Sequence, residues 1–290
     1  MAALPLSHAE KIFIIHGIED NLRNDGRSRL DYRSFEIETG TVSTASGSAR
    51  LRLANTDVLV GVKAELGVPA LHRPKEGNLE FFVHCSANAA PEFEGRGGEE
   101  LANDISSTLS RAYEDRNTLN LEGLCVAQGQ HCWLLYIDVL LLEVGGNLYD
   151  AVSIAVKSAL YDTKIPNLTL TTNEEGEVEI DLSEDPFDYI QINVEKCPVL
   201  VTCNKIGKTH IIDATMDEET CSLCRLVISV TQAGSITCMK KIGSGSLLPE
   251  SLIDMINTAK DVGMALNRAL LHQLNKEGNI EDRRYMGFLR

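Results

Sequence analysis

Residues 138–162 have the sequence DVLLLEVGGNLYDAVSIAVKSALYD, and this stretch decides the fold of the chain. It combines a long apolar strand, two adjacent glycines and a helix that is rich in small residues. The strand is expected over Cys132–Leu142, and its nearly continuous apolar character predicts burial on both faces. Gly145 and Gly146 let the strand meet the helix closely, because neither residue has a Cβ. The helix is expected over Tyr149–Tyr161, and its alanines and serines indicate close packing.

Short strands with turn signals precede this unit and predict an antiparallel sheet. Four are expected: Phe35–Thr41, Ala49–Leu53, Asp57–Glu65 and Leu79–Cys85. A helix that begins after Gly97 and Gly98 follows them, with its apolar residues on one face. Near the N-terminus, Ser7 and Glu10 have the spacing of a capping box, which predicts a short helix from Ser7 to Gly17.

The second half of the chain repeats this order of strands and helix. Five further strands are expected: Gln191–Val194, Val199–Cys203, His210–Asp213, Leu226–Thr231 and Ser235–Lys240. An amphipathic helix is expected from Pro249 to about Asn275. The loops CSANAAPEFEGRGGEEL and KKIGSGSLLPESL are similar, since each places a proline and an acidic residue before a helix. The sequence therefore predicts an α+β fold of two pseudo-repeated lobes, each with a mostly antiparallel sheet packed on helices.

These elements divide the chain into five parts. We expect an N-terminal helix and arm over 1–30, a first lobe over 31–166, an acidic linker over 167–190, a second lobe over 191–275 and a C-terminal tail over 276–290. Eight acidic residues lie in the linker between Asn173 and Asp188. Charge runs in polar segments are usually solvated, so this run predicts a surface segment and no catalytic site.

Composition limits the classes of function. The chain has 27 basic and 42 acidic residues, and its formal net charge is −15. This balance argues against strong independent binding to nucleic acid, because neutralisation of phosphate drives non-specific affinity. It favours basic partners instead. The N-terminus lacks the pattern of a signal peptide, and no stretch reaches the roughly 18 apolar residues that span a bilayer. We therefore expect a soluble, intracellular protein without membrane contact.

The eight cysteines and the acidic cluster of the second half raise the question of a metal site. Most of the cysteines lie in apolar runs and are expected to be reduced core residues. Cys221 and Cys224 have zinc-ligand spacing, but no second ligand pair follows, and in the expected strand they would face opposite sides. Asp213, Glu218 and Glu219 could hold a metal, although a solvent-facing turn is the favoured interpretation. No metal and no other cofactor is expected.

Five motifs in a fixed order resemble the RNase PH family, over about residues 20–275. They are Asp25-Gly26-Arg27, Gly47-Ser48-Ala49-Arg50, Asn55-Thr56-Asp57, the strand and GGN turn at 138–150, and Ile212-Asp213-Ala214-Thr215. The stretches GSARL, VLVGVKAE, EFEGRGG and HCWLLYIDVLLLEVGGNLYDA are most similar to one branch of the family. That branch comprises non-catalytic RNase PH-like ring subunits of the eukaryotic RNA exosome, which are related to the non-catalytic ring partner of archaeal exosomes.

The resemblance implies a set of partners and a location. The expected partners are other RNase PH-like subunits in a hetero-hexameric ring, RNA-binding cap proteins, an associated catalytic exoribonuclease, and RNA, which the isolated chain would bind weakly. The implied role is to close the ring and line the RNA path during 3′-to-5′ RNA processing and degradation, including rRNA maturation and mRNA turnover. The implied locations are the nucleus, the nucleolus and the cytoplasm.

The resemblance also implies that the catalytic residues are lost. Catalytic members carry a threonine and an arginine directly after the two glycines, and these residues bind phosphate. Asn147 and Leu148 stand there in this chain, and a leucine cannot donate a hydrogen bond. The essential aspartate of the second lobe falls on Arg225, while Glu219 keeps a neighbouring acidic position. The chain is therefore expected not to be an enzyme.

Arg96 is the expected RNA-binding residue. It lies in the glycine-rich loop EGRGG before a helix, where a flexible backbone and helix N-terminal amides suit phosphate. Arg111 and Arg116 are weaker candidates. The alternative for Arg96 is a solvated arginine or an interface ion pair.

Two other functions stay open at this point. One is an active phosphate-dependent 3′–5′ exoribonuclease, against which Asn147, Leu148 and Arg225 argue. The other is a metal hydrolase that uses Asp213 with the acidic residues after it. The segment Asp25-Gly26-Arg27 is either a contact to another subunit or cap protein, or a plain turn.

Overall fold

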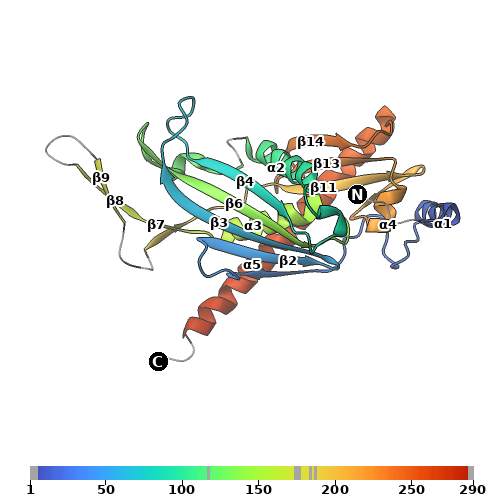
Figure 1. The fold of residues 1–290 in the computed structure, drawn as a ribbon, viewed down its shortest axis with the longest axis horizontal. Helices are drawn as coiled ribbons and strands as arrows, with labels where there is room; N and C mark the ends of the chain where they lie inside the picture. The colour runs from blue at the N-terminus through green and yellow to red at the C-terminus, as the bar shows by residue number, and fades with distance from the viewer. Residues whose placement is uncertain (1–5, 116–117, 173–177, 183–184, 186–187, 287–290) are drawn as a thin grey trace.

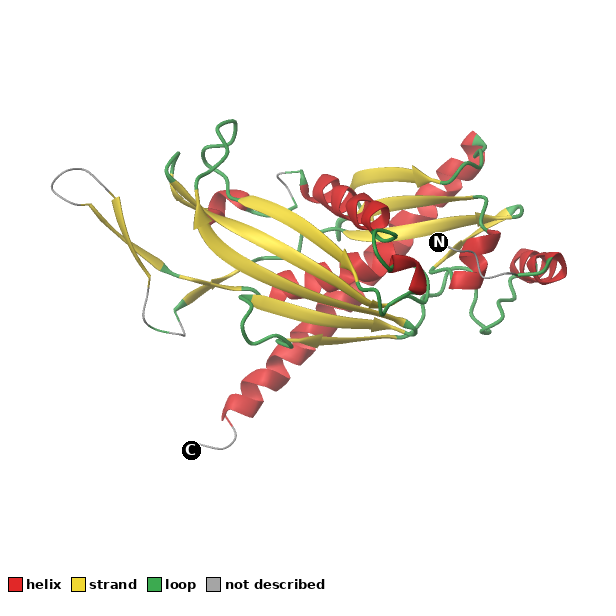
Figure 2. Ribbon diagram, viewed as in Figure 1, coloured by secondary structure: helices red, strands yellow, loops and turns green. Residues whose placement is uncertain are grey.

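The structure is a computed structural model that describes residues 6–115, 118–172, 178–182, 185 and 188–286. Two β-sheets lie on either side of the central helix α3 (Leu148–Asp162), as Figures 1 and 2 show. Every residue of α3 from Leu148 to Leu160 is buried. The alanines and serines of α3 therefore allow both sheets to approach it closely. The expected α+β arrangement of sheets packed on helices is confirmed.

The first sheet has the strand order β1-β2-β3-β6-β4, and β5 pairs with the start of β6. Its strands are β1 (Phe35–Thr39), β2 (Gly47–Leu53), β3 (Thr56–Gly67), β4 (Asn78–Cys85), β5 (Cys125–Ala127) and β6 (His131–Glu143). Neighbouring strands are antiparallel except β4 and β6, which are parallel. One face of the sheet packs on α3 through buried apolar residues such as Leu51, Val60 and Ile137.

Burial alternates along β6, so the expectation of burial on both faces is wrong. Leu135 and Ile137 are buried, whereas Tyr136 is partly exposed and Asp138 is exposed. The alternation was hidden in the sequence because leucines also occupy the outer face, where Leu134 and Leu140 are only partly buried. In a half-exposed antiparallel strand, polar and apolar residues normally alternate. In β6, buried and more exposed residues alternate, but most residues on both faces are apolar.

The second sheet has the order β12-β11-β13-β14 and is antiparallel throughout. Its strands are β11 (Val199–Ile206), β12 (Thr209–Ile212), β13 (Cys224–Val230) and β14 (Ile236–Ile242). Helix α5 (Pro249–Met286) packs on one face of this sheet and α3 lies on the other. Helix α2 (Glu99–Tyr113) contacts both β4 and β14. One hydrophobic cluster thus contains residues of both lobes, and a second cluster lies between the second sheet and α5.

The segment between the lobes differs from the expectation. Strand β10 (Tyr189–Gln191) pairs with β7 (Lys164–Pro166), so the strand expected over Gln191–Val194 is not part of the second sheet. Strands β8 (Leu168–Thr172) and β9 (Val178–Leu182) form a hairpin within the expected linker. This hairpin projects from the body at the end opposite to α1 (Figure 1). Residues 173–177, 183–184 and 186–187 of the linker lie outside the described part of the chain.

The last helix is longer than expected. Helix α5 ends at Met286, whereas its end was expected near Asn275 and the following residues were expected to form a tail. The residues after Asn275 are polar, but Lys, Glu and Arg are good helix formers, and Gly278 alone does not stop a helix. A change to mostly polar residues therefore does not by itself mark the end of a helix.

The predicted capping box is confirmed, whereas the strand that was predicted through Cys221 and Cys224 is not present. Helix α1 (His8–Glu19) has the expected capping box, in which the backbone N–H of Glu10 donates to Ser7 Oγ at 3.3 Å and that of Ser7 donates to Glu10 Oε2 at 2.7 Å. Cys221 ends helix α4 (Met216–Cys221) and Cys224 begins β13, so the expectation of a single strand through both is wrong.

Both of these cysteines are buried, and no cluster of metal-ligating side chains occurs among the described residues. Within the same residues, no helix has the length and apolar character that are needed to cross a membrane.

Candidate functional site

The turn between β6 and α3 meets the loop after β12 at the junction of the two lobes. A Cβ on Gly146 would lie 2.7 Å from the carbonyl oxygen of Ala214, and a Cβ on Gly145 would lie 2.6 Å from the Cβ of Asn55. Gly146 also has a φ of 95°, which favours glycine. Asn147 follows in the left-handed region and is the N-cap residue of α3. Close approach at this junction therefore requires both glycines.

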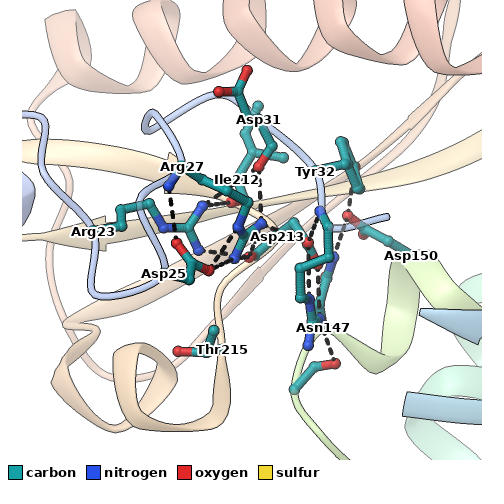
Figure 3. Close-up of polar contacts among 12 residues, drawn as sticks. Arg23, Asp25, Arg27, Asp31, Tyr32, Asn147, Asp150, Ile212, Asp213 and Thr215 are labelled. Carbon is teal, nitrogen blue, oxygen red and sulfur yellow. Dashed lines mark hydrogen bonds and ion pairs between the residues drawn. The ribbon is translucent and has the colours of Figure 1, made fainter. Parts of the chain in front are cut away.

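Asp213 is the centre of a buried polar network at this junction (Figure 3). Arg33 donates to it from the backbone N–H at 2.7 Å, from Nε at 3.0 Å and from Nη2 at 2.9 Å. Arg27 Nη1 donates at 2.9 Å, and Asn147 Nδ2 donates at 2.8 Å. Burial would raise the pKa of Asp213, but the bonds from Arg33 hold that pKa below its ordinary value. Asp213 is thus a charged structural acceptor.

The neighbouring acidic residue is paired in the same way. Arg23 Nε and Nη2 donate to the two carboxylate oxygens of Glu218 at 2.8 and 2.6 Å, and both residues are buried. Arg23 also donates to the carbonyl oxygens of Ile212 and Asp213 at 3.1 and 2.8 Å. The expectation that the acidic cluster faces solvent is wrong, because arginines from the N-terminal arm cover it.

Asp25-Gly26-Arg27 joins this network from the arm. Arg27 contacts Asp25 within the motif and Asp213 of the second lobe. The Arg27–Asp213 ion pair thus connects the N-terminal arm to the second lobe.

Glu219 and Arg225 form an ion pair beside the N-terminus of α3. Arg225 Nη1 donates to Glu219 Oε2 at 3.1 Å, and the backbone N–H of Asn147 donates to Glu219 Oε1 at 2.8 Å. The N-terminus of α3 therefore already holds a carboxylate. Burial raises the pKa of Glu219, and Arg225 opposes this rise. Leu148, the next residue of the turn, is buried.

A small cavity of about 300 Å³ lies beside this pair. It is lined by Glu100, Leu101, Asp104, Leu148, Tyr149, Glu219, Arg225 and Ile242. Three of these side chains are acidic, and the single cation among them, Arg225, is paired with Glu219. The cavity as lined is poorly suited to a phosphate, because a bound anion would meet carboxylates and a leucine where it needs donors.

A second buried carboxylate connects α3 to the arm and to the second sheet. Asp150 accepts hydrogen bonds from Tyr32 Oη at 2.7 Å, from Thr202 Oγ1 at 2.7 Å and from Asn147 Nδ2 at 3.0 Å. Burial raises the pKa of Asp150 to about 6, and these bonds oppose the rise. The three donors are neutral, so Asp150 differs from Asp213 in its electrostatic environment.

Several members of this network were not anticipated from the sequence. Arg23, Arg33 and Tyr32 lie in a polar segment without periodicity, which gives no local sign of burial. Asp150 could have been noticed, because it is an acidic residue inside an otherwise apolar helix. The structure brings Asn147 and Arg225, two of the predicted degenerate positions, close to each other. Both donate a hydrogen bond to Glu219.

The expected RNA-binding residues lie apart from this network. The Arg96 side chain is 91% exposed, and its Nε lies 3.8 Å from Glu99 Oε1. Arg111 lies on the exposed side of α2, near the end of that helix opposite to Arg96. Arg116 lies outside the described residues.

Comparison with known proteins places these observations in a family. A family model described as the 3′ exoribonuclease family, domain 1, matches residues 31–166, and the model of domain 2 matches residues 196–262. The chain belongs to the RNase PH family of 3′ exoribonucleases. The expected family is thereby confirmed.

Relatives of this RNase PH-family chain are similar over almost their whole length. A protein of Dictyostelium discoideum named putative exosome complex exonuclease RRP42 is 36% identical, and the match covers 90% of this chain and 95% of the relative. A protein of Pyrococcus furiosus named exosome complex component Rrp42 is 34% identical, with 93% and 95% covered.

Solved structures of the RNase PH fold superpose well on this chain. A chain of a structure described as an archaeal exosome core matches with a TM-score of 0.75 and 24% identity, over 90% of this chain and 95% of that chain. A chain of an Archaeoglobus fulgidus exosome with RNA bound to the active site matches with a TM-score of 0.76 and 24% identity, over 89% and 96%. At this identity the likeness establishes the fold.

Proposed function

We propose that this chain is a non-catalytic ring subunit of an RNA exosome. It supports 3′-to-5′ RNA processing and degradation, including rRNA maturation and mRNA turnover, by closing the ring and lining part of the RNA path. The names of its relatives support membership in an exosome. The observation that supports the loss of activity is the ion pair between Arg225 and Glu219 at the N-terminus of α3.

The chemistry of phosphorolysis explains why this pair matters. The reaction needs a phosphate that is held by cations and hydroxyl donors next to the RNA 3′ end, and an acid that assists the leaving group. Leu148 supplies neither charge nor donor, and the backbone N–H of Asn147 is already used by Glu219. Arg225 stands where the acid is expected, and it is committed to Glu219.

A metal hydrolase is not favoured by the same geometry. The carboxylates of Asp213 and Glu218 accept hydrogen bonds from three arginines, Arg23, Arg27 and Arg33. A divalent cation would have to displace these arginines, which would leave buried guanidinium groups without their acceptors.

Arg96 is our proposed RNA contact within the ring. Its guanidinium is highly exposed, and its ion pair with Glu99 is exposed too, so the pair holds the arginine only weakly. Glu99 and Glu100 occupy the first turn of α2 and weaken the attraction of that helix N-terminus for phosphate. The proposal therefore depends on the Arg96 side chain itself, with Arg111 as a secondary contact.

The proposed partners are other RNase PH-like subunits, RNA-binding cap proteins and a separate catalytic exoribonuclease. The proposed locations are the nucleus, the nucleolus and the cytoplasm, in keeping with a eukaryotic exosome. The net charge of −15 is consistent with weak RNA binding by the isolated chain.

The decisive test measures phosphate-dependent RNA degradation. The full-length chain is assayed alone and after co-expression with the other RNase PH-like subunits of its organism, with and without inorganic phosphate. A catalytically active RNase PH serves as the positive control. We expect stable co-assembly and no release of nucleoside diphosphates in either sample. Phosphate-dependent release by the chain alone would contradict the proposal.

A further inference from the structure

Two cysteines lie opposite each other in the hairpin formed by β5 and β6. Cys125 is the first residue of β5, and it pairs directly with Cys132 of β6 in the antiparallel register. Directly opposed residues of antiparallel strands have Cα atoms about 4.5–5.5 Å apart. A disulfide spans Cα distances of about 4.4–6.8 Å. The backbone therefore already holds these two residues at a distance that a disulfide can bridge.

The two thiols also lie close to each other. Side chains of directly opposed residues project to the same face of a sheet. Burial raises the pKa of the Cys132 thiol, and Cys125 contributes to that rise, as expected for two neighbouring thiols. Both are free thiols in this structure, with Cys132 buried and Cys125 partly exposed. An oxidant therefore reaches Cys125 first.

We propose that Cys125 and Cys132 are a redox modification site that forms a reversible disulfide with hydroperoxides or with glutathione disulfide as the oxidant. With hydrogen peroxide, the Cys125 thiolate attacks one oxygen, the O–O bond breaks, and a sulfenic acid and a hydroxide form. The hydroxide takes up the proton that the Cys125 thiol released and becomes the first water. The Cys132 sulfur then attacks the Cys125 sulfur, the S–O bond breaks, and the departing hydroxide takes up a proton to form the second water. The two cysteines lose two electrons and two protons, and the peroxide is reduced to water.

Glutathione disulfide gives the same product by exchange. The Cys125 thiolate attacks one sulfur of the glutathione disulfide and releases one glutathione thiolate. Cys132 then attacks the Cys125 sulfur of the mixed disulfide and releases the second glutathione. No other reactant is needed, so both routes are balanced.

The local backbone can accommodate the bond. Cβ atoms of opposed residues are typically about 4.5–5.5 Å apart, and a disulfide needs about 3.5–4.5 Å, so a closure of about 1 Å is required. Strand β5 has three residues and pairs with β6 alone, and the register shifts between Cys125 and Ala127. A short strand with a bulge at the margin of the sheet adjusts more easily than a central strand.

The cysteine pair that is conspicuous in the sequence is less suitable. Cys221 ends α4 and Cys224 begins β13, so these residues are not opposed on paired strands. Both are buried, which also hinders access of an oxidant. The structure thus favours Cys125 and Cys132, which are seven residues apart and do not match a known cysteine motif.

Peptide mapping of the full-length chain tests the proposal. The folded protein is treated with glutathione disulfide or hydrogen peroxide, free thiols are alkylated, and the tryptic peptides are analysed by mass spectrometry. No lysine or arginine separates Cys125 from Cys132, so one peptide carries both. We expect this peptide to lose a pair of hydrogens, to escape alkylation and to recover both thiols after dithiothreitol. Cys85 and Cys238 are also partly exposed but lie opposite Leu141 and Ser229, so neither should form an intramolecular disulfide, and they serve as internal controls.

Variants separate pairing from general oxidation. In Cys125→Ser, Cys132 should stay reduced at the oxidant concentration that converts the wild-type pair. In Cys132→Ala, Cys125 should stop at a glutathione adduct or a sulfenic acid. Should either variant fail to fold by circular dichroism, the wild-type peptide map decides alone. An adduct on wild-type Cys125 with Cys132 still free, or a bond from either residue to another cysteine, would overturn the proposal. The outcome does not depend on exosome membership, so the two proposals can fail separately.

Discussion

Arg225 donates to Glu219 across 3.1 Å at the position where phosphorolytic relatives are expected to place an acid. The same carboxylate accepts the backbone N–H of Asn147 at 2.8 Å. Arg225 and the backbone of Asn147 thus hold the two carboxylate oxygens of Glu219. The Glu219 side chain is only 5% exposed, and the positive charge of Arg225 opposes the rise in the pKa of Glu219 that this burial causes. We therefore expect this ion pair to contribute to the stability of the junction at the N-terminus of α3.

Replacing Arg225 by leucine should lower the free energy of unfolding by about 1–3 kcal/mol, because Glu219 would keep its burial and lose its cation. Denaturant titration at neutral pH measures this difference. The double variant Arg225→Leu with Glu219→Gln removes both charges and should recover part of the loss. If Arg225→Leu alone were as stable as the wild type, the Arg225–Glu219 pair would make no contribution to the free energy of unfolding.

Replacing Asp213 by asparagine should be more damaging, with a loss of about 3–5 kcal/mol, because Arg33 and Arg27 would lose their buried counter-charge. Asp25 is a matched control, since it also pairs with Arg27 but its side chain is 36% exposed, and Asp25→Asn should cost about 0–1 kcal/mol. Equal losses in the two variants would contradict the central role of Asp213.

The pH dependence of the Asp213 contribution has a defined sign. Its pKa is lower in the folded protein than in the unfolded chain. Its contribution is therefore present above the unfolded pKa and is lost as the pH falls through the folded pKa. The gap in stability between the wild type and Asp213→Asn should narrow on acidification, and a gap that widens would contradict this assignment.

Asp150 should show the opposite pH dependence. Its pKa is raised from 3.8 to about 6, so the folded state binds the proton more tightly than the unfolded chain does. The contribution of Asp150 to stability should therefore fall as the pH rises from 3.8 to about 6. The difference between these two values corresponds to about 3 kcal/mol.

Comparison of the wild type with Asp150→Asn isolates this effect from that of other carboxylates. Asparagine does not titrate, so the variant should gain stability relative to the wild type as the pH rises through this window. The absolute offset between the two proteins also contains the altered hydrogen bonds to Tyr32 and Thr202, so the slope is the informative quantity. Parallel pH profiles would exclude an elevated pKa for Asp150.

The contrast between local and long-range information explains what the sequence could predict. The strand, the Gly145-Gly146 turn and helix α3 follow from apolar runs and glycine chemistry, which are local properties. The pairing of Arg33 with Asp213 joins residues 180 positions apart, and neither residue has a sequence signal of burial. The sequence therefore predicts that Asp213 and Glu218 face solvent, whereas both are buried. Likewise, buried and more exposed residues alternate along β6, but apolar residues occupy both faces. The sequence therefore predicts more burial than the structure has.

Arg96→Ala should weaken RNA binding by the assembled ring while leaving the stability of the chain nearly unchanged. The side chain is 91% exposed and its ion pair with Glu99 is 3.8 Å long, so its removal should cost about 0–1 kcal/mol of folding free energy. Removing one cation that neutralises a phosphate reduces the salt dependence of RNA binding by about one unit of slope. Measurement of RNA affinity at several salt concentrations therefore reports directly whether Arg96 binds phosphate.

Arg52→Ala is the matched control, because Arg52 is about half exposed on β2 of the first sheet and its replacement should not change the slope. Equal slopes for the wild type and Arg96→Ala would assign Arg96 to the solvated loop arginines, and the RNA path would have to be sought elsewhere on the subunit.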